Sequence, residues 1–417
     1  MKKTIWIWNH YAGSMYGERG GRHYAFAKYL KQAGYEPVVF CSNARHGKAE
    51  TYFPDTDLWQ EHEAEEIGVP FVFVQGRTYE GNGAQRVLNM VDFYRNVKKT
   101  ARAYAKARGK PDVIYASSVH PLTLVAGIQT AKHFGVRCVC EVRDLWPESI
   151  VAYSNRFTRE HPLIRLLYRG EKWIYQKADA LIFTMEGGYD YITERGWEQA
   201  VPRAKVHYIN NGVDLEQFRY NQAHFRTEDA DLEDPSVFKV VYTGSIRHVN
   251  QLGTLLDAAK QVTDPAVRFL IWGDGDQRAL LEQRVREEDI TNVIFKGKVE
   301  KKYVPDIVTK ADLNLIHGSN DGKSLLRFGI SSNKMFDCFA AGKPILMDIV
   351  AEYNPVAQFH VGVCVDRPEA LPQAIAGLRQ ADGDVLGSLC RNAERAAEAY
   401  DYRQLTERLL KVLEKER

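Results

Sequence analysis

The segment at 329–344 contains the residues whose types best suit ligand chemistry. Ser332 and Asn333 are good N-cap residues, and the apolar pattern behind them indicates a short helix that begins near 333. The free N–H groups and positive dipole end of such a helix attract an anion, and Lys334 adds a full charge. One turn further, the Asp337 carboxylate could accept hydrogen bonds from ribose or sugar hydroxyls. An ordinary capped helix would show the same local pattern.

A second polar segment, at 242–248, includes the end of an apolar run and the residues after it. Gly244 permits close approach of the backbone to a ligand, and Ser245 lies beside it. Arg247 comes at the carboxyl end of the expected strand, which is where ligands bind in open α/β sheets. A guanidinium group at that edge suits a diphosphate.

Gly273 and Asp274 close another apolar run and precede a helical pattern. Asp274 and Asp276 resemble the D-x-D triplet that some sugar transferases use to hold a divalent metal. The triplet is short and common, so we favour a helix N-terminal turn that lines a nucleotide pocket. Lys298 and Val299 end the next expected strand and could line the same pocket.

The first half of the chain offers weaker signals. Gly20 and Gly21 follow the first expected strand and open a helix, but they match neither a P-loop nor G-x-G-x-x-G. His120 and Asp144 each follow an expected strand, so both should project from the carboxyl edge of one sheet. Either alone is more often structural than catalytic. The absence of G-x-S-x-G disfavours a Ser/His/Asp hydrolase.

Short apolar runs that alternate with amphipathic stretches must position these residues. The expected strands are 4–8, 37–41, 71–74, 112–117, 137–142, 180–185 and 206–210 in the first half, and 239–244, 268–273, 292–297, 313–317, 344–348 and 362–366 in the second. Helical patterns at 22–33, 84–109, 121–134, 163–177 and 186–196 separate most of the first set. This order predicts an α/β fold with two doubly wound domains, each a parallel sheet covered on both faces.

A polar, acidic stretch at 219–236 interrupts this rhythm and predicts a linker. We therefore expect four parts, namely an N-terminal domain over 1–210, a linker over 211–236, a C-terminal domain over 237–400 and a final helix over 401–417.

Composition and charge limit the kinds of partner that the protein is expected to bind. The 417 residues carry a formal net charge of +2, which excludes a protein that coats nucleic acid or another polyanion. The charge is uneven, because the stretch at 86–110 holds eight basic residues and one acid. That stretch is either a solvated helix face or a contact for anionic lipid headgroups or a lipid-linked phosphate acceptor. At 162–173, Arg165 and Arg169 lie among aliphatic residues, and this helix could pack on the sheet or press into a bilayer surface.

Neither the N-terminus nor the cysteines indicate export. The apolar run at 4–8 is shorter than a signal peptide requires, and the six cysteines have no C-x-x-C spacing, which favours free thiols. We expect a cytoplasmic protein that is at most peripheral on the inner face of the cytoplasmic membrane.

Taken together, these segments resemble the retaining, nucleotide-sugar-dependent glycosyltransferases of sequence family 4. The resemblance covers nearly the whole chain, and several motifs occur in one order. They are Gly20-Gly21, Asn211-Gly-Val-Asp214, Tyr242-Thr-Gly-Ser245, Gly273-Asp-Gly275, Gly297-Lys-Val299 and Ala341-Gly-Lys-Pro344. Asp144-Leu-Trp-Pro147 and the residues at 332–337 look most like the branch that builds O-antigen lipopolysaccharide, capsule or exopolysaccharide.

The resemblance implies the GT-B architecture, in which two Rossmann-like domains face each other across a cleft. A nucleoside-diphosphate sugar, in our expectation UDP-linked, would bind the C-terminal domain, and a lipid-linked or saccharide acceptor would bind mainly the N-terminal domain. The expected activity is the transfer of a hexosyl or N-acetylhexosaminyl group in polysaccharide biosynthesis.

The resemblance also implies roles for single residues. Gly20 and Gly21 would approach the donor diphosphate, and His120 would contact the donor sugar. Arg247 would hold the diphosphate together with the amides near Ser332, Asn333 and Lys334, and Asp337 would bind the ribose. The candidate catalytic residues are His120, Arg247 and Asp144. No metal cofactor is implied, because positive side chains and helix dipoles would stabilise the leaving diphosphate.

The sequence departs from the family pattern at two points. The paired glutamates of the family, separated by seven residues, correspond to Gly329 and Asp337, and the lysine that usually follows the arginine is absent, because the next lysine after Arg247 is Lys260. Two other functions stay open. One is a nucleotide-sugar epimerase or hydrolase on the same fold, and the other is a non-catalytic nucleotide-sugar-binding protein.

Overall fold

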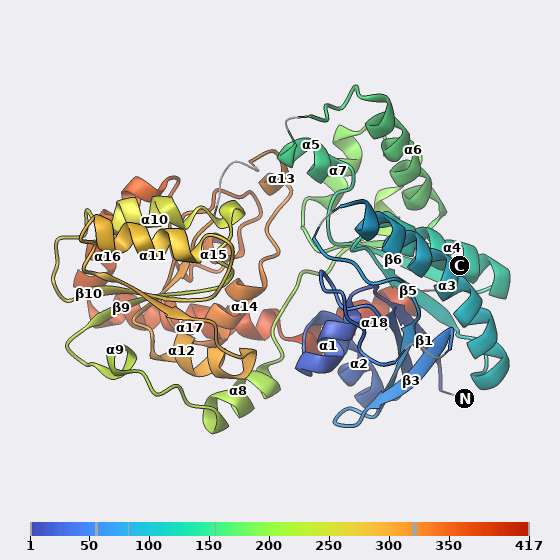
Figure 1. The fold of residues 1–417 in the computed structure, drawn as a ribbon, viewed down its shortest axis with the longest axis horizontal. Helices are drawn as coiled ribbons and strands as arrows, with labels where there is room; N and C mark the ends of the chain where they lie inside the picture. The colour runs from blue at the N-terminus through green and yellow to red at the C-terminus, as the bar shows by residue number, and fades with distance from the viewer. Residues whose placement is uncertain (1, 55–56, 82, 155, 319–322, 416–417) are drawn as a thin grey trace. The chain divides into compact units, whose positions relative to one another are not determined.

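The computed structural model describes residues 2–54, 57–81, 83–154, 156–318 and 323–415. The chain divides into two compact units, which we call unit 1 (Met1–Asn210 with Tyr402–Arg417) and unit 2 (Asn211–Asp401). Each unit contains one sheet with helices on both faces (Figure 1). The prediction of two α/β domains with Rossmann-like sheets is therefore confirmed.

Unit 1 is built on an eight-stranded sheet in the order β3-β4-β2-β1-β5-β6-β7-β8. The strands are β1 Thr4–Trp8, β2 Glu36–Ser42, β3 Trp59–Ala64, β4 Val69–Val74, β5 Val113–Ser117, β6 Arg137–Val142, β7 Ala180–Phe183 and β8 Val206–Tyr208. All neighbours pair in parallel except β3, which runs antiparallel to β4. The central strands are buried on both faces, which explains why they read as unbroken apolar runs.

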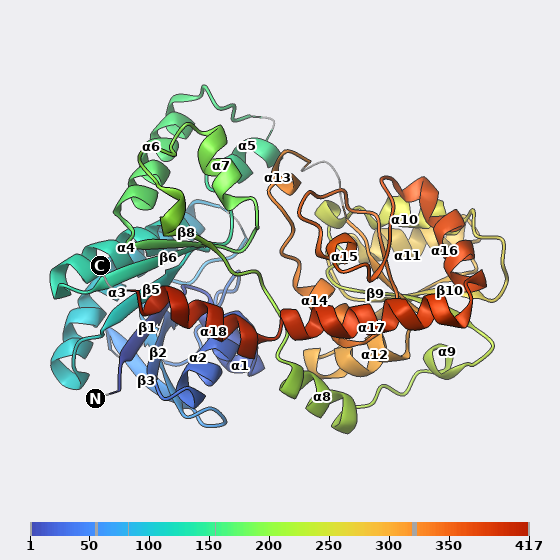
Figure 2. The ribbon, with the colours of Figure 1, turned by 180° about the vertical axis from the view of Figure 1, so that it is seen from behind.

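The helices of unit 1 lie in two layers over this sheet. They are α1 Ala12–Glu18, α2 Arg22–Gln32, α3 Ala84–Arg108, α4 Pro121–Phe134, α5 Glu148–Tyr153, α6 Pro162–Lys177, α7 Gly188–Glu194 and α18 Tyr402–Leu413. One layer contains α1, α2 and α18, and the other contains α3, α4 and α6 (Figure 2). The expected terminal helix therefore belongs to unit 1, where α18 packs against α2.

Sequence patterns missed β3. Its residues are mostly polar and only partly buried, because β3 is the edge strand of the sheet and pairs on one side only. Periodicity detects strands by their apolar faces, so a polar edge strand gives little signal. Sequence patterns also missed α1, which lies between β1 and the glycines before α2.

Unit 2 is built on a fully parallel six-stranded sheet in the order β11-β10-β9-β12-β13-β14. The strands are β9 Phe238–Thr243, β10 Val267–Trp272, β11 Val293–Gly297, β12 Leu313–Ile316, β13 Ile345–Met347 and β14 Gly362–Cys364. The helices are α8 Leu215–His224, α9 Ala230–Glu233, α10 Leu252–Ala259, α11 Arg278–Glu287, α12 Val304–Lys310, α13 Lys323–Leu326, α14 Asn333–Ala340, α15 Pro355–Gln358, α16 Leu371–Gln380 and α17 Gly383–Ala399. Apolar residues of α10, α11 and α16 pack on one face of the sheet, and apolar residues of α9 and α12 pack on the other.

The stretch expected as a linker is part of unit 2 and contains two helices. The Asp214 side chain accepts a hydrogen bond from Gln217 N (3.1 Å) and caps α8. The Asp229 side chain accepts one from Leu232 N (3.0 Å) and caps α9, and Leu232 is buried against the sheet. Asp229, one of the acidic residues that suggested a linker, is therefore a helix cap, which is a position where aspartate is preferred.

Two further expectations concern thiols and membrane spans. All six cysteines are free, and Cys138 and Cys140 are buried in β6. Across the part of the chain that the structure describes, no helix has both the length and the apolar character needed to cross a bilayer.

Candidate functional site

In unit 2, loops that follow β9, β10 and β11 pack backbone against backbone. Gly273 N donates a hydrogen bond to Gly297 O (2.8 Å), and Gly244 N donates to Trp272 O (3.0 Å). Gly273 has φ +155°, and a Cβ atom there would lie 1.8 Å from Gly244 O. Glycine at 273 is therefore required to bring these loops together at the carboxyl edge of the sheet.

Lys334 lies beside these loops. Its Nζ atom donates to Tyr242 Oη (2.9 Å) and lies 3.0 Å from the position that a Cβ of Gly244 would take. Ser332 is the N-cap of α14 but makes no side-chain capping bond, so the first N–H groups of the helix have no side-chain cap. Burial lowers the pKa of Lys334 to about 8. A positive charge, a helix N-terminus and an open glycine backbone thus meet in one place, which is the chemistry of an anion site.

Asp337 lies one turn into α14 with a carboxylate that makes no hydrogen bond to any residue described here. Burial raises the pKa of Asp337, which nearby Lys301 partly offsets. Asn333, also predicted, is exposed at the first position of the helix. The structure thus keeps Asp337 as an available acceptor near the positive end of α14.

Arg247 is placed differently from the other predicted phosphate ligands. It is exposed and lines a pocket of about 540 Å³ between α10 and α11, which Gly244, Gly273 and Asp337 do not line. Within the described residues, no contact joins Arg247 to Lys334. Ser245 turns its hydroxyl to Asn250 Oδ1 (2.9 Å).

Asp274 lies in the loop that precedes α11. Its Oδ1 accepts a hydrogen bond from Gly275 N (2.9 Å) and lies 4.0 Å from Arg278 on the helix that follows. No group of three or more His, Cys, Asp or Glu side chains that could hold a metal ion occurs in the described part of the chain. At the next strand end, Lys298 is exposed and Val299 packs against the core under α12.

Sequence reasoning missed a buried pair at the ends of β12 and β13. His317 Nδ1 lies 2.6 Å from Asp348 Oδ2, and both side chains have no exposed surface. His317 Nε2 also lies 3.1 Å from Gln251 O, at the start of α10. The two residues are 31 positions apart, so only the adjacency of β12 and β13 in the sheet brings them together.

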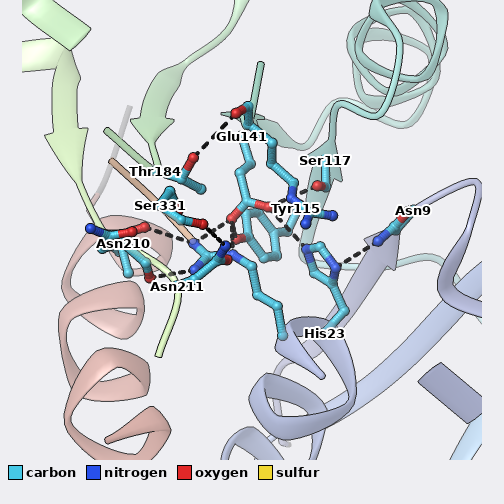
Figure 3. A network of polar contacts seen from close by, with 12 residues as sticks. Asn9, His23, Tyr115, Ser117, Glu141, Thr184, Asn210, Asn211 and Ser331 are labelled. Carbon is cyan, nitrogen blue, oxygen red and sulfur yellow. Dashed lines mark hydrogen bonds and ion pairs between the residues drawn. The ribbon is translucent and has the colours of Figure 1, made fainter. Parts of the chain in front are cut away.

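In unit 1, the end of β6 carries a buried carboxylate with four donors around it (Figure 3). Glu141 accepts hydrogen bonds from Arg22 Nε (2.7 Å), Ser117 Oγ (2.7 Å), His23 Nε2 (3.1 Å) and Tyr115 Oη. Burial raises the pKa of Glu141, but the charges of Arg22 and His23 outweigh it and hold that pKa well below 4.5. Glu141 is thus a buried anion.

Arg22 continues from this carboxylate to the end of unit 1. Its guanidinium donates hydrogen bonds to Ile209 O (2.9 Å) and to Asn210 O. Asn210 is the last residue of the first of the two chain segments that form unit 1. Gly21, with φ +95°, is the N-cap of α2. The first two residues of the helix, Arg22 and His23, are buried inside the unit. On the unit 2 side, Asn211 Nδ2 donates to Ser331 O (2.9 Å), just before α14. Asn210 is therefore held within unit 1 and Asn211 within unit 2, on either side of the point where the chain passes from one unit to the other.

The predicted residues of unit 1 lie in different surroundings. His120 is 1% exposed and pairs with His10, whose Nδ1 lies 2.6 Å from His120 Nε2. Asp144 is exposed, and no contact joins it to His120 within the described residues. Gly20 lies between α1 and α2, where a Cβ atom would have Glu18 O as its nearest neighbour, 3.8 Å away. His10 was not predicted, although it follows a strand as His120 does.

Two family models match the chain in succession. The model described as a glycosyl transferase 4-like domain matches residues 21–212, and the model described as glycosyl transferases group 1 matches residues 237–380. Together they cover most of the chain. The two parts of the chain therefore each match a glycosyltransferase domain, and the fold is that of the GT-B glycosyltransferases.

Two curated proteins are similar to part of the chain. WcaI of Escherichia coli (strain K12), named for a glycosyl transferase of colanic acid biosynthesis, is 24% identical over 198 residues, which are 44% of this chain and 46% of WcaI. TuaH of Bacillus subtilis (strain 168), named for a glycosyltransferase of teichuronic acid biosynthesis, is 24% identical over 216 residues, which are 50% of this chain and 49% of TuaH. The matches thus span about half the length of these relatives.

Solved structures share the fold over the whole chain. Sucrose-phosphate synthase from Thermosynechococcus elongatus superposes with a TM-score of 0.71 at 17% identity and covers 99% of this chain and 98% of its own. HepE from Anabaena, solved in complex with UDP, gives a TM-score of 0.63 at 15% identity and covers 99% of both chains. At these identities the likeness concerns the fold alone.

Proposed function

We propose that this protein is a retaining glycosyltransferase that uses a nucleoside-diphosphate sugar, UDP-linked, as donor. The acceptor is a lipid-linked or saccharide molecule in cell-surface polysaccharide synthesis, and the transferred group is a hexosyl or N-acetylhexosaminyl unit. The diphosphate is held by positive charge and helix dipole without a bound metal, and the protein works in the cytoplasm.

One observation carries the proposal, namely the anion site at the carboxyl edge of unit 2. Lys334, the uncapped start of α14 and the glycine backbone after β9 lie together, and Asp337 provides a hydroxyl acceptor one turn away. Phosphate oxygens can bind to the lysine, the helix N-terminus and the glycine backbone, and a ribose hydroxyl can donate to Asp337. The names of WcaI and TuaH and the UDP complex of HepE support the substrate class.

A ligand screen followed by a transfer assay tests the proposal. UDP, GDP, ADP and dTDP and their sugars are compared by thermal shift, in EDTA and in magnesium, and we expect UDP compounds to stabilise the protein most in both buffers. A donor that binds only with magnesium would contradict metal-independent binding. Transfer to membrane-extracted glycolipid is then followed by NMR of the anomeric proton, and an inverted product would contradict retention.

The two other functions predict different results with the donor alone. An epimerase would convert UDP-glucose into an isomer, and a hydrolase would release free sugar, both without an acceptor. A binding protein would be stabilised by a donor but would show no turnover with any acceptor. Turnover that depends on an added acceptor separates the transferase from both of these functions.

We also propose that unit 1 binds anionic membranes through α6. Its inner face packs into the unit through Ile164, Ile174 and Tyr175, whereas its outer face exposes apolar side chains. These are Leu163 (48% exposed), Leu166 (61%) and Trp173 (37%). Helix α6 therefore has two apolar faces and only one is covered, which suits a helix lying in a bilayer surface.

Charge on α6 favours an anionic surface. Arg165 and Arg169 are exposed beside the apolar residues, whereas Glu171, the sole acid of the helix, is buried and accepts hydrogen bonds from Tyr175 and Tyr191. The basic helix α3 adds a second cationic surface, where Arg102 and other basic side chains line a pocket of about 530 Å³. Each exposed cation near an anionic leaflet contributes about 1 kcal/mol.

Sedimentation with vesicles tests the membrane contact. The protein should sediment with phosphatidylglycerol vesicles at low salt, less at high salt, and not with phosphatidylcholine alone. Leu166→Glu should abolish sedimentation, whereas Leu280→Glu, at an equally exposed leucine of α11 (60%), should not. Equal sedimentation of the two variants would contradict the role of α6.

A further inference from the structure

The buried pair of His317 and Asp348 lies at the carboxyl edge of unit 2, the same edge as the anion site. His317 follows β12 and Asp348 follows β13, and these strands are neighbours in the sheet. His317 Nδ1 lies 2.6 Å from Asp348 Oδ2, and His317 Nε2 lies 3.1 Å from Gln251 O. The imidazole therefore links a buried carboxyl group to a main-chain carbonyl group of a distant loop.

The partners of His317 fix where its protons lie. A carbonyl oxygen can only accept a hydrogen bond, so His317 Nε2 must carry a proton and donate it to Gln251 O. At 2.6 Å, His317 Nδ1 and Asp348 Oδ2 share one more proton, which is bound either to the imidazole of an ion pair or to the carboxyl of a neutral pair. The Nε2–H donor is present in both cases.

Gln251 adopts a backbone conformation that has to be held in place. Its φ of 48° and ψ of 40° lie in the left-handed region, which residues other than glycine occupy rarely. The Gln251 carbonyl oxygen also accepts hydrogen bonds from Thr254 N (3.0 Å) and Thr254 Oγ1 (2.9 Å) in α10. Those two bonds are local to the start of the helix, whereas the His317 bond ties the carbonyl group to the sheet.

Gln251 ends the loop between β9 and α10, residues 244–251, and this loop begins in the anion site. At that end, Lys334 Nζ donates a hydrogen bond to Tyr242 Oη (2.9 Å), and Tyr242 Oη donates one to Ser245 O (3.0 Å). The loop is therefore held near its start by the Tyr242 hydroxyl and at its last residue by the His317 imidazole.

Hydrogen bonds inside the loop connect its last residue to Arg247. Gln251 N donates to His248 O (3.1 Å), and Asn250 N donates to Arg247 O (2.8 Å). Ser245 Oγ donates to Asn250 Oδ1 (2.9 Å), which joins the two ends of the loop. A shift of Gln251 would therefore move Arg247 and Ser245 as well.

We infer that His317 and Asp348 are positioning residues that hold the loop at 244–251 in the shape that binds the donor diphosphate. This inference rests on the proposed function, in which the glycine backbone of this loop receives that diphosphate. Both side chains have no exposed surface, so they act through the loop and not by touching the ligand. A loop that already has its binding conformation loses less freedom when the ligand binds, which raises the affinity.

Nitrogen-15 NMR of the histidine rings in the ligand-free protein tests the bond from His317 to the loop. Long-range proton–nitrogen spectra distinguish protonated from bare ring nitrogens, and His317→Gln assigns the signals of His317. We expect a protonated Nε2 at pH 7. A bare Nε2 would overturn the inference, because the ring could not then donate to Gln251 O.

Two substitutions of His317 separate its two contacts. The carboxamide of His317→Gln extends as far as Nε2 and can donate to Gln251 O, whereas that of His317→Asn ends near Nδ1 and reaches only Asp348. We expect the affinity for UDP, measured by calorimetry, to be retained in His317→Gln and to fall about tenfold in His317→Asn, the effect of one lost hydrogen bond. Equal affinities of the natural protein and a folded His317→Asn variant would contradict the positioning role.

The role of Asp348 is tested by the same measurement. The carboxamide of Asp348→Asn can donate to a bare Nδ1 and so leaves the proton on Nε2, and this variant should keep its affinity for UDP. Asp348→Leu removes the partner of Nδ1 and should weaken UDP binding. Unchanged affinity in a folded Asp348→Leu variant would remove Asp348 from the inference.

Asn314→Leu is the matched control for a general loss of stability. Asn314 is fully buried on β12, and its Nδ2 donates to a main-chain oxygen, Val308 O (3.0 Å). This substitution should lower the thermal stability, as His317→Asn does, but should leave the UDP affinity of the folded protein unchanged. A matching loss of affinity in Asn314→Leu would overturn the inference, because affinity would then follow stability and not the loop.

Amide hydrogen exchange of the ligand-free protein tests the loop without any donor. The amides of Asn250 and Gln251 should exchange about tenfold faster in His317→Asn than in the natural protein or in His317→Gln. Unchanged exchange would contradict the positioning role. If UDP does not bind the natural protein, the proposed donor class is wrong, while the exchange rates and the histidine spectrum still decide whether His317 holds the loop.

Discussion

Arg22 and Glu141 form an ion pair that is almost completely removed from solvent. Arg22 Nη2 lies 2.6 Å from Glu141 Oε2, and the side chains are 2% and 0% exposed. The two residues are 119 positions apart, at the start of α2 and the end of β6. Because the same guanidinium donates to Ile209 O and Asn210 O, the pair also fixes the point where the chain leaves unit 1.

Removal of one partner of this pair should strongly destabilise the protein. Glu141→Gln leaves the Arg22 charge buried without a counter-ion, and we expect the free energy of unfolding to fall by about 3–5 kcal/mol. Asp92→Asn is the matched control, because it breaks a partly exposed pair with Arg77 (43% and 21% exposed) and should cost no more than about 1 kcal/mol. Urea denaturation measures both. Equal effects would show that the buried pair has no special role.

The same pair predicts a pH dependence of stability. The pKa of Glu141 in the folded protein lies well below 4.5, so the unfolded state binds a proton first as the pH falls. The stabilisation is therefore complete above about pH 4.5 and is lost as the pH falls through the folded pKa. The Glu141→Gln variant should lack this part of the loss of stability at low pH. Parallel curves of unfolding free energy against pH would contradict the prediction.

Donor binding should depend on pH through Lys334. Its pKa is lowered to about 8 by burial, so the ammonium loses its proton as the pH rises from 7 to 9. We expect the affinity for UDP, measured by calorimetry, to fall over that range. Lys334→Arg should bind without this loss, because a guanidinium stays charged, and Lys334→Met should bind weakly at every pH. A pH-independent affinity of the natural protein would remove Lys334 from the phosphate site.

Arg247 provides a test of transition-state stabilisation. If it contacts the leaving diphosphate, Arg247→Ala should raise the activation free energy by about 2–3 kcal/mol, roughly a 30- to 150-fold loss in rate. Arg286→Ala removes the same charge from an exposed position of α11 and should leave the rate unchanged. Since Arg247 lines the pocket between α10 and α11, a normal rate in the first variant would assign it to that pocket instead.

Gly273 should be one of the least replaceable glycines of unit 2. An added Cβ would overlap Gly244 O, and because backbone cannot swing away, Gly273→Ala should destabilise by at least about 1–3 kcal/mol and weaken UDP binding. At Gly377, inside α16, no atom lies within 4 Å of the added Cβ. Gly377→Ala should therefore stabilise by roughly 0.5–1 kcal/mol. Thermal unfolding of both variants measures the contrast.

Local sequence was sufficient for most of the elements and for two residues of the proposed anion site. Strands such as β1 and β6 are continuous apolar runs, and burial on both faces requires that pattern. The start of α14 was also predictable, because capping residues and a following apolar face act over one or two turns. Lys334 and Asp337 were identified in this way.

Tertiary structure alone decided which of these side chains meet. His10 and His120 are 110 positions apart, and Lys334 and Tyr242 are 92 apart, so their contacts depend on strand order and on loop packing. Periodicity assigns a residue to a face or an edge, but not to a neighbour from a distant segment. For that reason the sequence did not predict the contact of Lys334 with Tyr242 or the buried pair of Glu141 with Arg22.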